Sequence, residues 1–142
     1  MRYTSTYLLL FTILNLLTQT LLAQDGTTCA QAIPVTTGGN GGTVYSTCDG
    51  LNNFSAPGPN SCFDQGALTT NYAAGRDLYL SFTPSLTGCY NIIPYDYGGF
   101  NLPGIFVYSG CPAAGNCVGG NIQLLDGISL QAGINYIIVI SS

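Results

Sequence analysis

Short apolar segments, separated by glycine and proline, recur along most of this chain. In the clearest of them, Leu78, Leu80 and Phe82 alternate with Tyr79 and Ser81, so that the two sets point to opposite sides. Beyond the apolar amino terminus, no segment sustains a helical period. Many short strands joined by glycine-rich turns predict an all-β fold, an antiparallel β-sandwich or jelly roll.

Other strands are expected on either side of recognisable turns. They cover residues 33–36, 43–46, 77–83, 89–93, 105–108, 122–125, 129–130 and 136–140. Asp126-Gly127 predicts a hairpin turn between two of them. The polar stretch 48–75, rich in Pro, Gly and Asn, predicts a long loop, either a binding loop or a variable insertion.

The amino terminus has the form of an export signal. Arg2 gives a cationic start, residues 7–17 form an apolar core, and Ala23 precedes the expected cleavage point. An uncleaved anchor is the alternative, but an apolar run of about a dozen residues is short of the roughly 20 that span a bilayer. We expect a signal peptide over 1–23, one domain over 24–142, no membrane span after cleavage, and a secreted or cell-surface location.

After this leader the chain carries few groups able to do chemistry. It has no His, Glu, Lys or Trp, and six aspartates stand against Arg76 alone. The negative charge argues against nucleic acid as a partner, and the lack of His excludes Ser–His hydrolysis. Asp64, Asp77, Asp96 and Asp126 are available for glycosidase chemistry, which needs two carboxylates, but turns and strand ends also account for them. We predict a non-enzyme with no catalytic residue.

Six cysteines, all after the leader, predict disulfide bonds in an exported chain. Zinc is the competing interpretation, but there is no C-x-x-C spacing and no His to support it. Cys111 and Cys117 flank a turn-forming stretch and are expected to pair. For the remaining cysteines we prefer Cys29 with Cys48 and Cys62 with Cys89, and the sequence leaves other pairings open.

A glycine-rich stretch gathers aromatic and hydrogen-bonding side chains. Such rings can stack on sugars or on protein side chains, although they can equally fold back to cap the core. The candidate ligand-binding residues are Tyr95, Asp96, Tyr97, Phe100 and Asn101.

Three further residues have two interpretations each. Tyr79 and Tyr90, on outward strand faces, either extend this patch or reflect β-propensity alone. Asn53 begins an Asn-Phe-Ser sequon, which is a glycosylation site only in a host that glycosylates.

An ordered set of motifs covers nearly the whole chain after the leader. Residues 75–84 (GRDLYLSFTP) and 130–139 (LQAGINYIIV) hold two strand motifs, and 29–33, 88–92 and 105–111 hold shorter ones. The set resembles the bacterial pre-peptidase C-terminal-like (PPC-like) domains, with their G-x-D-x-x-Y-x-F-T-P and L-x-A-G-x-x-Y-Y-I-V strands. The resemblance implies a jelly-roll-like β-sandwich, found in secreted proteases and surface proteins, that serves as a targeting or binding module.

Two departures from this family argue against calcium, which some relatives bind through carboxylates. Gly119-Gly120-Asn121 replaces an Asp-rich turn, and residues 100–104 replace a usual aspartate and threonine. Calcium takes about six to eight oxygen ligands, several of them carboxylates, whereas the aspartates here are scattered. We therefore expect no metal and no other cofactor.

The relatives continue past the strand that matches 136–140 into another strand, whereas Ser141 and Ser142 end this sequence. We expect either a C-terminally incomplete fragment or a sandwich whose open edge receives a strand from a copy of itself, with Gln24 to Val35 as donor. Two functions follow. One is an exported binding or surface-display module for an extracellular glycan, peptide, protein or cell surface. The other is a self-assembling extracellular structural subunit, in a filament or matrix.

Overall fold

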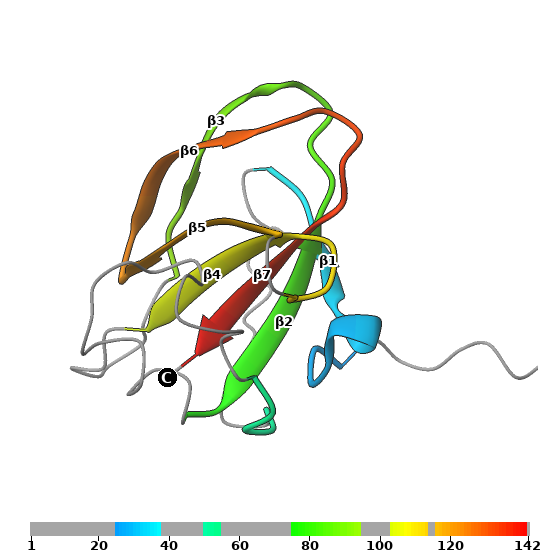
Figure 1. The fold of residues 1–142 in the computed structure, drawn as a ribbon, viewed down its shortest axis with the longest axis vertical. Helices are drawn as coiled ribbons and strands as arrows, with labels where there is room; N and C mark the ends of the chain where they lie inside the picture. Colours follow the sequence, from blue (N-terminus) through cyan, green and yellow to red (C-terminus); the bar gives the residue numbers. More distant parts are fainter. Residues whose placement is uncertain (1–24, 38–49, 55–74, 95–102, 114–115, 142) are drawn as a thin grey trace, which may run out of the picture.

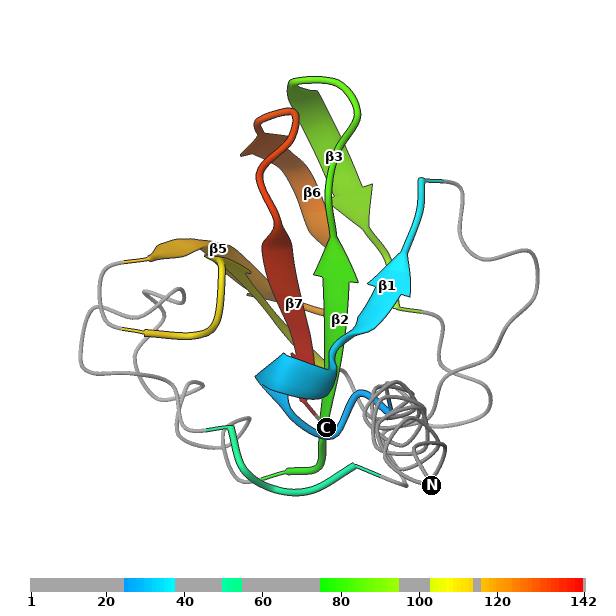
Figure 2. The same cartoon turned by 90° about the vertical axis from the view of Figure 1, so that its right-hand side faces the viewer.

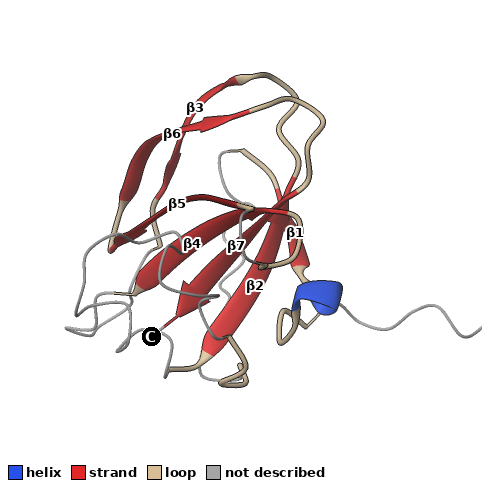
Figure 3. Cartoon of the chain, viewed as in Figure 1, coloured by secondary structure: helices blue, strands red, loops and turns tan. Residues whose placement is uncertain are grey.

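The computed structural model describes residues 25–37, 50–54, 75–94, 103–113 and 116–141. Within these ranges the chain is an all-β sandwich with one short 3₁₀ helix (Figure 1, Figure 3). The predicted fold class is confirmed, while the predicted leader 1–23 lies outside the described residues. The elements are η1 (Cys29–Gln31), β1 (Ile33–Val35), β2 (Asp77–Phe82), β3 (Gly88–Ile92), β4 (Gly104–Ser109), β5 (Cys117–Ile122), β6 (Leu125–Leu130) and β7 (Tyr136–Ser141).

Five strands form one sheet in the order β1-β2-β7-β4-β5, and β3 pairs with β6 in a second sheet. Neighbouring strands are antiparallel except β1 and β2, which are parallel. Figure 1 shows β3 and β6 above the larger sheet. The strand nearest the carboxyl end, β7, lies at the centre of the larger sheet, between β2 and β4.

We call the face of the five-stranded sheet that packs against β3 and β6 the inner face. Because side chains alternate along a strand, β2, β4 and β7 each give this face every second residue. Its most buried members include Ile105 and Val107 from β4, both 0% exposed, and they pack with Leu130 of β6. Leu78, Leu80 and Phe82 all belong to this core, as their alternation predicts.

We call the opposite face of the same sheet the outer face. It carries Tyr79, Phe106 and Tyr108, and it is covered by Phe54 and by Ala32, which follows η1. Figure 2 shows η1 lying across β7 and β2. The larger sheet therefore has a buried cluster on both faces, and the outer one is built by segments far from β2 and β4 in sequence.

Gly26 lets the amino-terminal segment pass close to the edge of β2. Its carbonyl accepts a hydrogen bond from the N–H of Tyr79 at 2.7 Å. Its φ is +71°, and a Cβ at this position would lie 2.7 Å from Cδ1 of Leu78 and 2.9 Å from Cδ1 of Ile33. Only glycine combines a left-handed conformation with so close an approach.

The hairpin turn predicted at Asp126-Gly127 is wrong, because both residues lie inside β6. In the β3–β6 register, Tyr90 pairs with Ile128 and Ile92 pairs with Leu125, which leaves Asp126 and Gly127 opposite Asn91. This is a β-bulge, in which glycine at positive φ takes up the extra residue, and Gly127 has a φ of +67°. The N–H of Gly127 donates to Oδ1 of Asn91 at 2.9 Å, which fixes the bulge.

The predicted pairs Cys111–Cys117 and Cys29–Cys48 are also wrong, because Cys29 is bonded to Cys111. Cys117 lies opposite Tyr108 within the β4–β5 ladder, so it does not meet Cys111 across the turn. Cys117 is disulfide-bonded, with a partner outside the described residues. Cys89 is an exposed free thiol, which contradicts the expected Cys62–Cys89 pair.

The side chain of Asn116 closes the β4–β5 turn in place of the expected disulfide. Its Nδ2 donates to the carbonyls of Cys111 at 2.7 Å and Ser109 at 3.2 Å. Its Oδ1 accepts from the N–H of Ala113 at 3.0 Å. An asparagine side chain that bonds to nearby backbone groups in this way is a common means of fixing a turn.

Assembly by donation of Gln24 to Val35 does not fit the described part of that segment. Within its own chain, Ile33 pairs with Leu80 and Val35 with Phe82, so the segment already completes the edge of the larger sheet. The edge expected beside residues 136–140 is not open either, because β7 pairs with β2 on one side and β4 on the other. Among the described residues we find no helix with the length and apolar character needed to cross a membrane.

Candidate functional site

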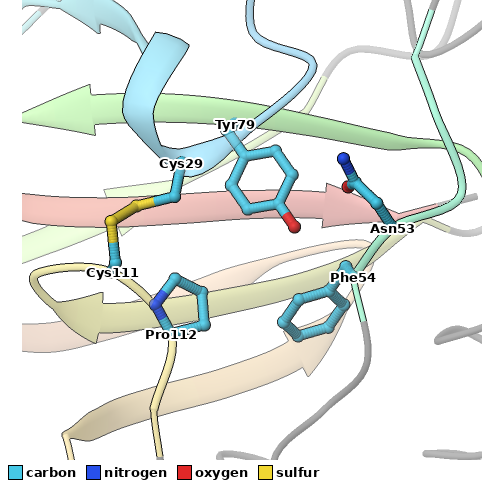
Figure 4. A pocket seen from close by; sticks show the side chains of 6 residues that line it. All are labelled: Cys29, Asn53, Phe54, Tyr79, Cys111 and Pro112. Carbon is cyan, nitrogen blue, oxygen red and sulfur yellow. A yellow bond between two sulfur atoms is a disulfide. The ribbon is translucent and has the colours of Figure 1, made fainter.

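A pocket of about 210 Å³ opens on the outer face. Its walls come from η1, from the segment 50–54, from β2 and from the turn that follows β4. In Figure 4 the Tyr79 ring lies between the disulfide and Asn53, and its hydroxyl points into the space beside Phe54. The lining residues are Cys29, Asn53, Phe54, Tyr79, Cys111 and Pro112.

The Cys29–Cys111 disulfide fixes one wall of this pocket. It joins η1 to the end of β4, with the two Cα atoms 5.7 Å apart and 82 positions between them in sequence. The covalent link holds Pro112 beside Tyr79, although Tyr79 lies on β2, Pro112 follows β4, and β7 separates these two strands. This wall therefore depends on an oxidising environment, as predicted for an exported chain.

Hydrogen bonds fix the opposite wall, made by Asn53 and Phe54. Nδ2 of Asn53 donates to the carbonyl of Thr27 at 2.7 Å. The backbone N–H groups of Asn53 and Phe54 donate to Oδ2 of Asp77 at 2.9 and 2.7 Å. The segment 50–54 is thus tied both to the amino-terminal segment and to the first residue of β2.

Aromatic rings form the base of this wall. The ring of Phe54 lies 4.9 Å from that of Phe106 and 6.1 Å from that of Tyr108, centroid to centroid, the second at an edge-on angle of 66°. Tyr108 is 0% exposed, and its hydroxyl has no hydrogen-bond partner among the described residues. Such a group costs free energy where it stands, so the outer cluster is not optimised for stability alone.

The lining of the pocket is uncharged at physiological pH. Burial, with a smaller contribution from the nearby Asp77 carboxylate, raises the pKa of Tyr79 to about 12. Burial also raises the pKa of Tyr108 to about 12, with a smaller contribution from Tyr79. Both phenols therefore stay neutral and can act as hydrogen-bond donors. The other five lining residues have no ionised side chain.

The candidate ligand-binding residues from the sequence, Tyr95, Asp96, Tyr97, Phe100 and Asn101, lie outside the described residues and stay a prediction. Tyr79 and Tyr90, which were considered as extensions of this patch, lie within the described residues. Tyr79 is on the outer face as expected, but it is 5% exposed and packs in the pocket wall.

Tyr90 does not face outward. Its ring packs edge-on against Phe82 in the inner core, with centroids 5.3 Å apart, and its hydroxyl donates to the carbonyl of Leu86 at 2.6 Å. The predicted outward orientation of Tyr90 is therefore wrong. Its place in β3 puts it on the side of that small sheet that meets the inner face.

Asn53 is a predicted, host-dependent glycosylation site, and in the structure its side chain also makes a hydrogen bond. Nδ2, the atom that glycosylation would modify, donates to Thr27. Glycosylation of Asn53 stays a prediction that depends on the host.

Phe54, Pro112 and the disulfide were not singled out as site residues from the sequence. No local signal marks them, because they meet only when three distant segments cover one face of the sheet. The sequence features that pointed toward this region were the long polar loop 48–75, the sequon at Asn53 and the outward position of Tyr79.

Two aspartates near the site are committed to backbone and hydroxyl partners. Oδ1 of Asp25 accepts from the N–H and hydroxyl of Thr27 at 2.9 and 2.8 Å, and these bonds lower the pKa of Asp25. Asp77 holds Asn53 and Phe54. In the part of the chain described here, no three Asp, Cys, Glu or His side chains group as metal ligands would.

A scan against protein-family models and searches of curated proteins and of solved structures found no match to this chain. The pocket is therefore interpreted from its own geometry and chemistry.

Proposed function

We propose that this chain is an exported, non-catalytic binding domain whose outer-face pocket takes an uncharged sugar residue of an extracellular glycan. The observation that carries the proposal is the lining of the pocket. It combines two aromatic rings, Phe54 and Tyr79, with an amide at Asn53, and it includes no ionised side chain.

A sugar ring has one apolar face and a rim of hydroxyl groups. Aromatic rings and Pro112 offer apolar surface for such a face, and ligand pockets typically add a few polar groups that set orientation. Here the Tyr79 hydroxyl and the Asn53 side chain are the polar groups of the lining. An acidic or basic ligand would find no opposite charge among these six residues.

A binding role is also supported by how the nearest carboxylate is used. Glycosidases need two carboxyl groups that face a shared substrate. Asp77 is 0% exposed and accepts two backbone N–H groups instead of facing the pocket. The export signal and the resemblance to PPC-like domains support a place outside the cell and a targeting or binding role.

The proposal is tested by a glycan array that carries neutral and acidic oligosaccharides, followed by titration calorimetry of each neutral binder. Tyr79→Phe removes one hydroxyl from the pocket and keeps the ring. One neutral hydrogen bond is worth about 1 kcal/mol, so the affinity should fall about fivefold. Tyr90→Phe is the matched control, because Tyr90 lies on β3 of the other sheet and its hydroxyl bonds to the carbonyl of Leu86, and it should leave affinity unchanged.

If the Tyr79→Phe variant and the parent protein bind the glycan with equal affinity, the pocket is not the binding site. Binding of extended peptides, with none to neutral glycans, would overturn the sugar assignment.

A further inference from the structure

Asp77 connects the first residue of β2 to the segment 50–54 through three hydrogen bonds. Its Oδ2 accepts from the N–H groups of Asn53 at 2.9 Å and Phe54 at 2.7 Å. Its own N–H donates to the carbonyl of Leu51 at 3.1 Å. The side chain is 0% exposed, so these bonds are shielded from water.

The same two residues, Asn53 and Phe54, form the pocket wall opposite the Cys29–Cys111 disulfide. Phe54 is 3% exposed and packs on Phe106. The segment 50–54 meets the sheet at Asp77, through the isolated bridge between Leu51 and Asp77. We propose that Asp77 is the positioning residue for the Asn53–Phe54 wall, and that protonation of its carboxyl group controls how firmly that wall is held.

The geometry around the carboxyl group fits a proton-dependent contact. One oxygen, Oδ2, accepts both N–H groups, while Oδ1 is buried without a partner among the described residues. Protonation removes the charge from the buried Oδ1, which burial favours, although a neutral acid accepts the two N–H groups less strongly than a carboxylate does. An ionised carboxylate would instead leave a charged oxygen buried and unsolvated.

The electrostatic balance agrees with that geometry. Burial raises the pKa of Asp77, and the N–H of Phe54, the hydroxyl of Ser141 and the N–H of Asn53 offset part of the rise. Detachment of the wall would expose the carboxyl group to water and let its pKa fall toward the ordinary 3.8, so the proposal requires the proton to favour the docked form. The wall is held most firmly below the ordinary value of 3.8 and less firmly as the pH rises through the higher pKa of the docked state.

Few other groups near Asp77 titrate in this range. Tyr79 on β2 and Tyr108 on β4 titrate near 12, and Ser141 of β7 does not ionise. The segment 50–54 contains no ionisable side chain. Asp25, on the amino-terminal segment, has a lowered pKa and so titrates below 3.8. Among the described residues around the wall, a titration above that value therefore reports Asp77.

The importance of this contact for binding rests on the proposed function, but the contact itself can be tested without a ligand. In a nitrogen-15 NMR titration of the mature chain from pH 3 to pH 8, the amide resonances of Asn53 and Phe54 should move along one curve with a midpoint above 3.8. The Asp77→Asn variant keeps an oxygen acceptor and has no charge, so this movement should vanish. Asp126→Asn, on the exposed side of β6, is the control that should leave it intact.

A second readout uses the absence of tryptophan from the sequence. Phe54→Trp places a single fluorophore in the wall, and its quenching by acrylamide should increase as pH rises through the Asp77 titration. In the same background, Asp77→Asn should give low quenching at every pH, and Asp77→Ala high quenching at every pH.

Two results would overturn the proposal. One is a set of Asn53 and Phe54 amide resonances that do not titrate above 3.8 in the unsubstituted protein. The other is the same movement persisting in Asp77→Asn. Either result would leave the glycan proposal standing. If the titration is observed but no glycan binds, the glycan proposal fails and the positioning role of Asp77 is kept.

Discussion

The inner face of the five-stranded sheet buries mostly aliphatic side chains from β2, β4 and β7 against β6. The outer face buries aromatic rings and a carboxyl group, and a disulfide links two of the segments around it. The inner side chains alternate along continuous strands. The outer cluster is closed by pieces of chain from well before β2, held at points such as Cys29 and Asp77. The contrast indicates that the inner core stabilises the fold, and that the outer layer is fixed by a few specific bonds.

The largest effect is expected from removing the covalent bond of the outer layer. The double substitution Cys29→Ser and Cys111→Ser opens a link across 82 positions, which in the chain-entropy model lowers the free energy of unfolding by about 4 kcal/mol. Urea unfolding measures the loss. A loss below about 1 kcal/mol would contradict this prediction, because the disulfide would then contribute little to stability.

A cavity in the inner core should have the next largest effect. Leu130 is 1% exposed in β6, and Leu130→Ala should lower the free energy of unfolding by about 3 kcal/mol, since a buried leucine loses both burial and packing. Leu86, which is 72% exposed, provides the matched control, and Leu86→Ala should change it by less than about 0.5 kcal/mol. Equal losses at the two positions would show that the β3–β6 layer does not bury the inner face.

Removal of the Asp77 carboxyl group should cost less than either change above. Asp77→Ala leaves the N–H groups of Asn53 and Phe54 without their acceptor, which should cost about 2 kcal/mol at low pH. Because ionisation of the buried carboxyl group is itself unfavourable, the cost should become smaller as pH rises through its raised pKa. Urea unfolding at several pH values checks both statements. A cost that grows as pH rises would contradict this prediction, because the ionised carboxyl group would then stabilise the chain more than the neutral one does.

The smallest expected effect has the opposite direction. Tyr108→Phe removes a buried hydroxyl that has no partner among the described residues, so it should stabilise the chain by about 1 kcal/mol. Thermal unfolding detects this as a rise in melting temperature. Tyr136→Phe is the control, because its hydroxyl accepts from the N–H of Gln131 at 2.9 Å, and it should be destabilising.

The sequence was informative wherever one strand carries its own signal. The alternation of Leu78, Leu80 and Phe82 identifies β2 and its inner side, and the apolar run at 136–140 identifies β7. Turns were less predictable, because an Asp-Gly pair can form either a hairpin turn or a bulge. Asn91 on the facing strand decides between them, by accepting from Gly127.

The candidate site was hardly predictable, because its parts share no local pattern. Tyr79 was singled out, but as part of a different patch. Disulfide pairing failed for the same reason, since proximity in sequence favoured Cys111 with Cys117. The fold instead brings η1 onto the outer face and puts Cys29 beside Cys111.

Hydrogen exchange, followed residue by residue in Asp77→Ala at low pH, tests the central claim most directly. That claim is that specific bonds hold the outer layer independently of the inner core. The amides of Asn53 and Phe54 should exchange at least about tenfold faster than in the parent protein, as the loss of more than about 1.4 kcal/mol of local stability requires. The amides of β7 that pair with β2 and β4 should show a smaller change. Equal acceleration in the wall and in β7 would contradict the claim, because the two faces would then unfold as one unit.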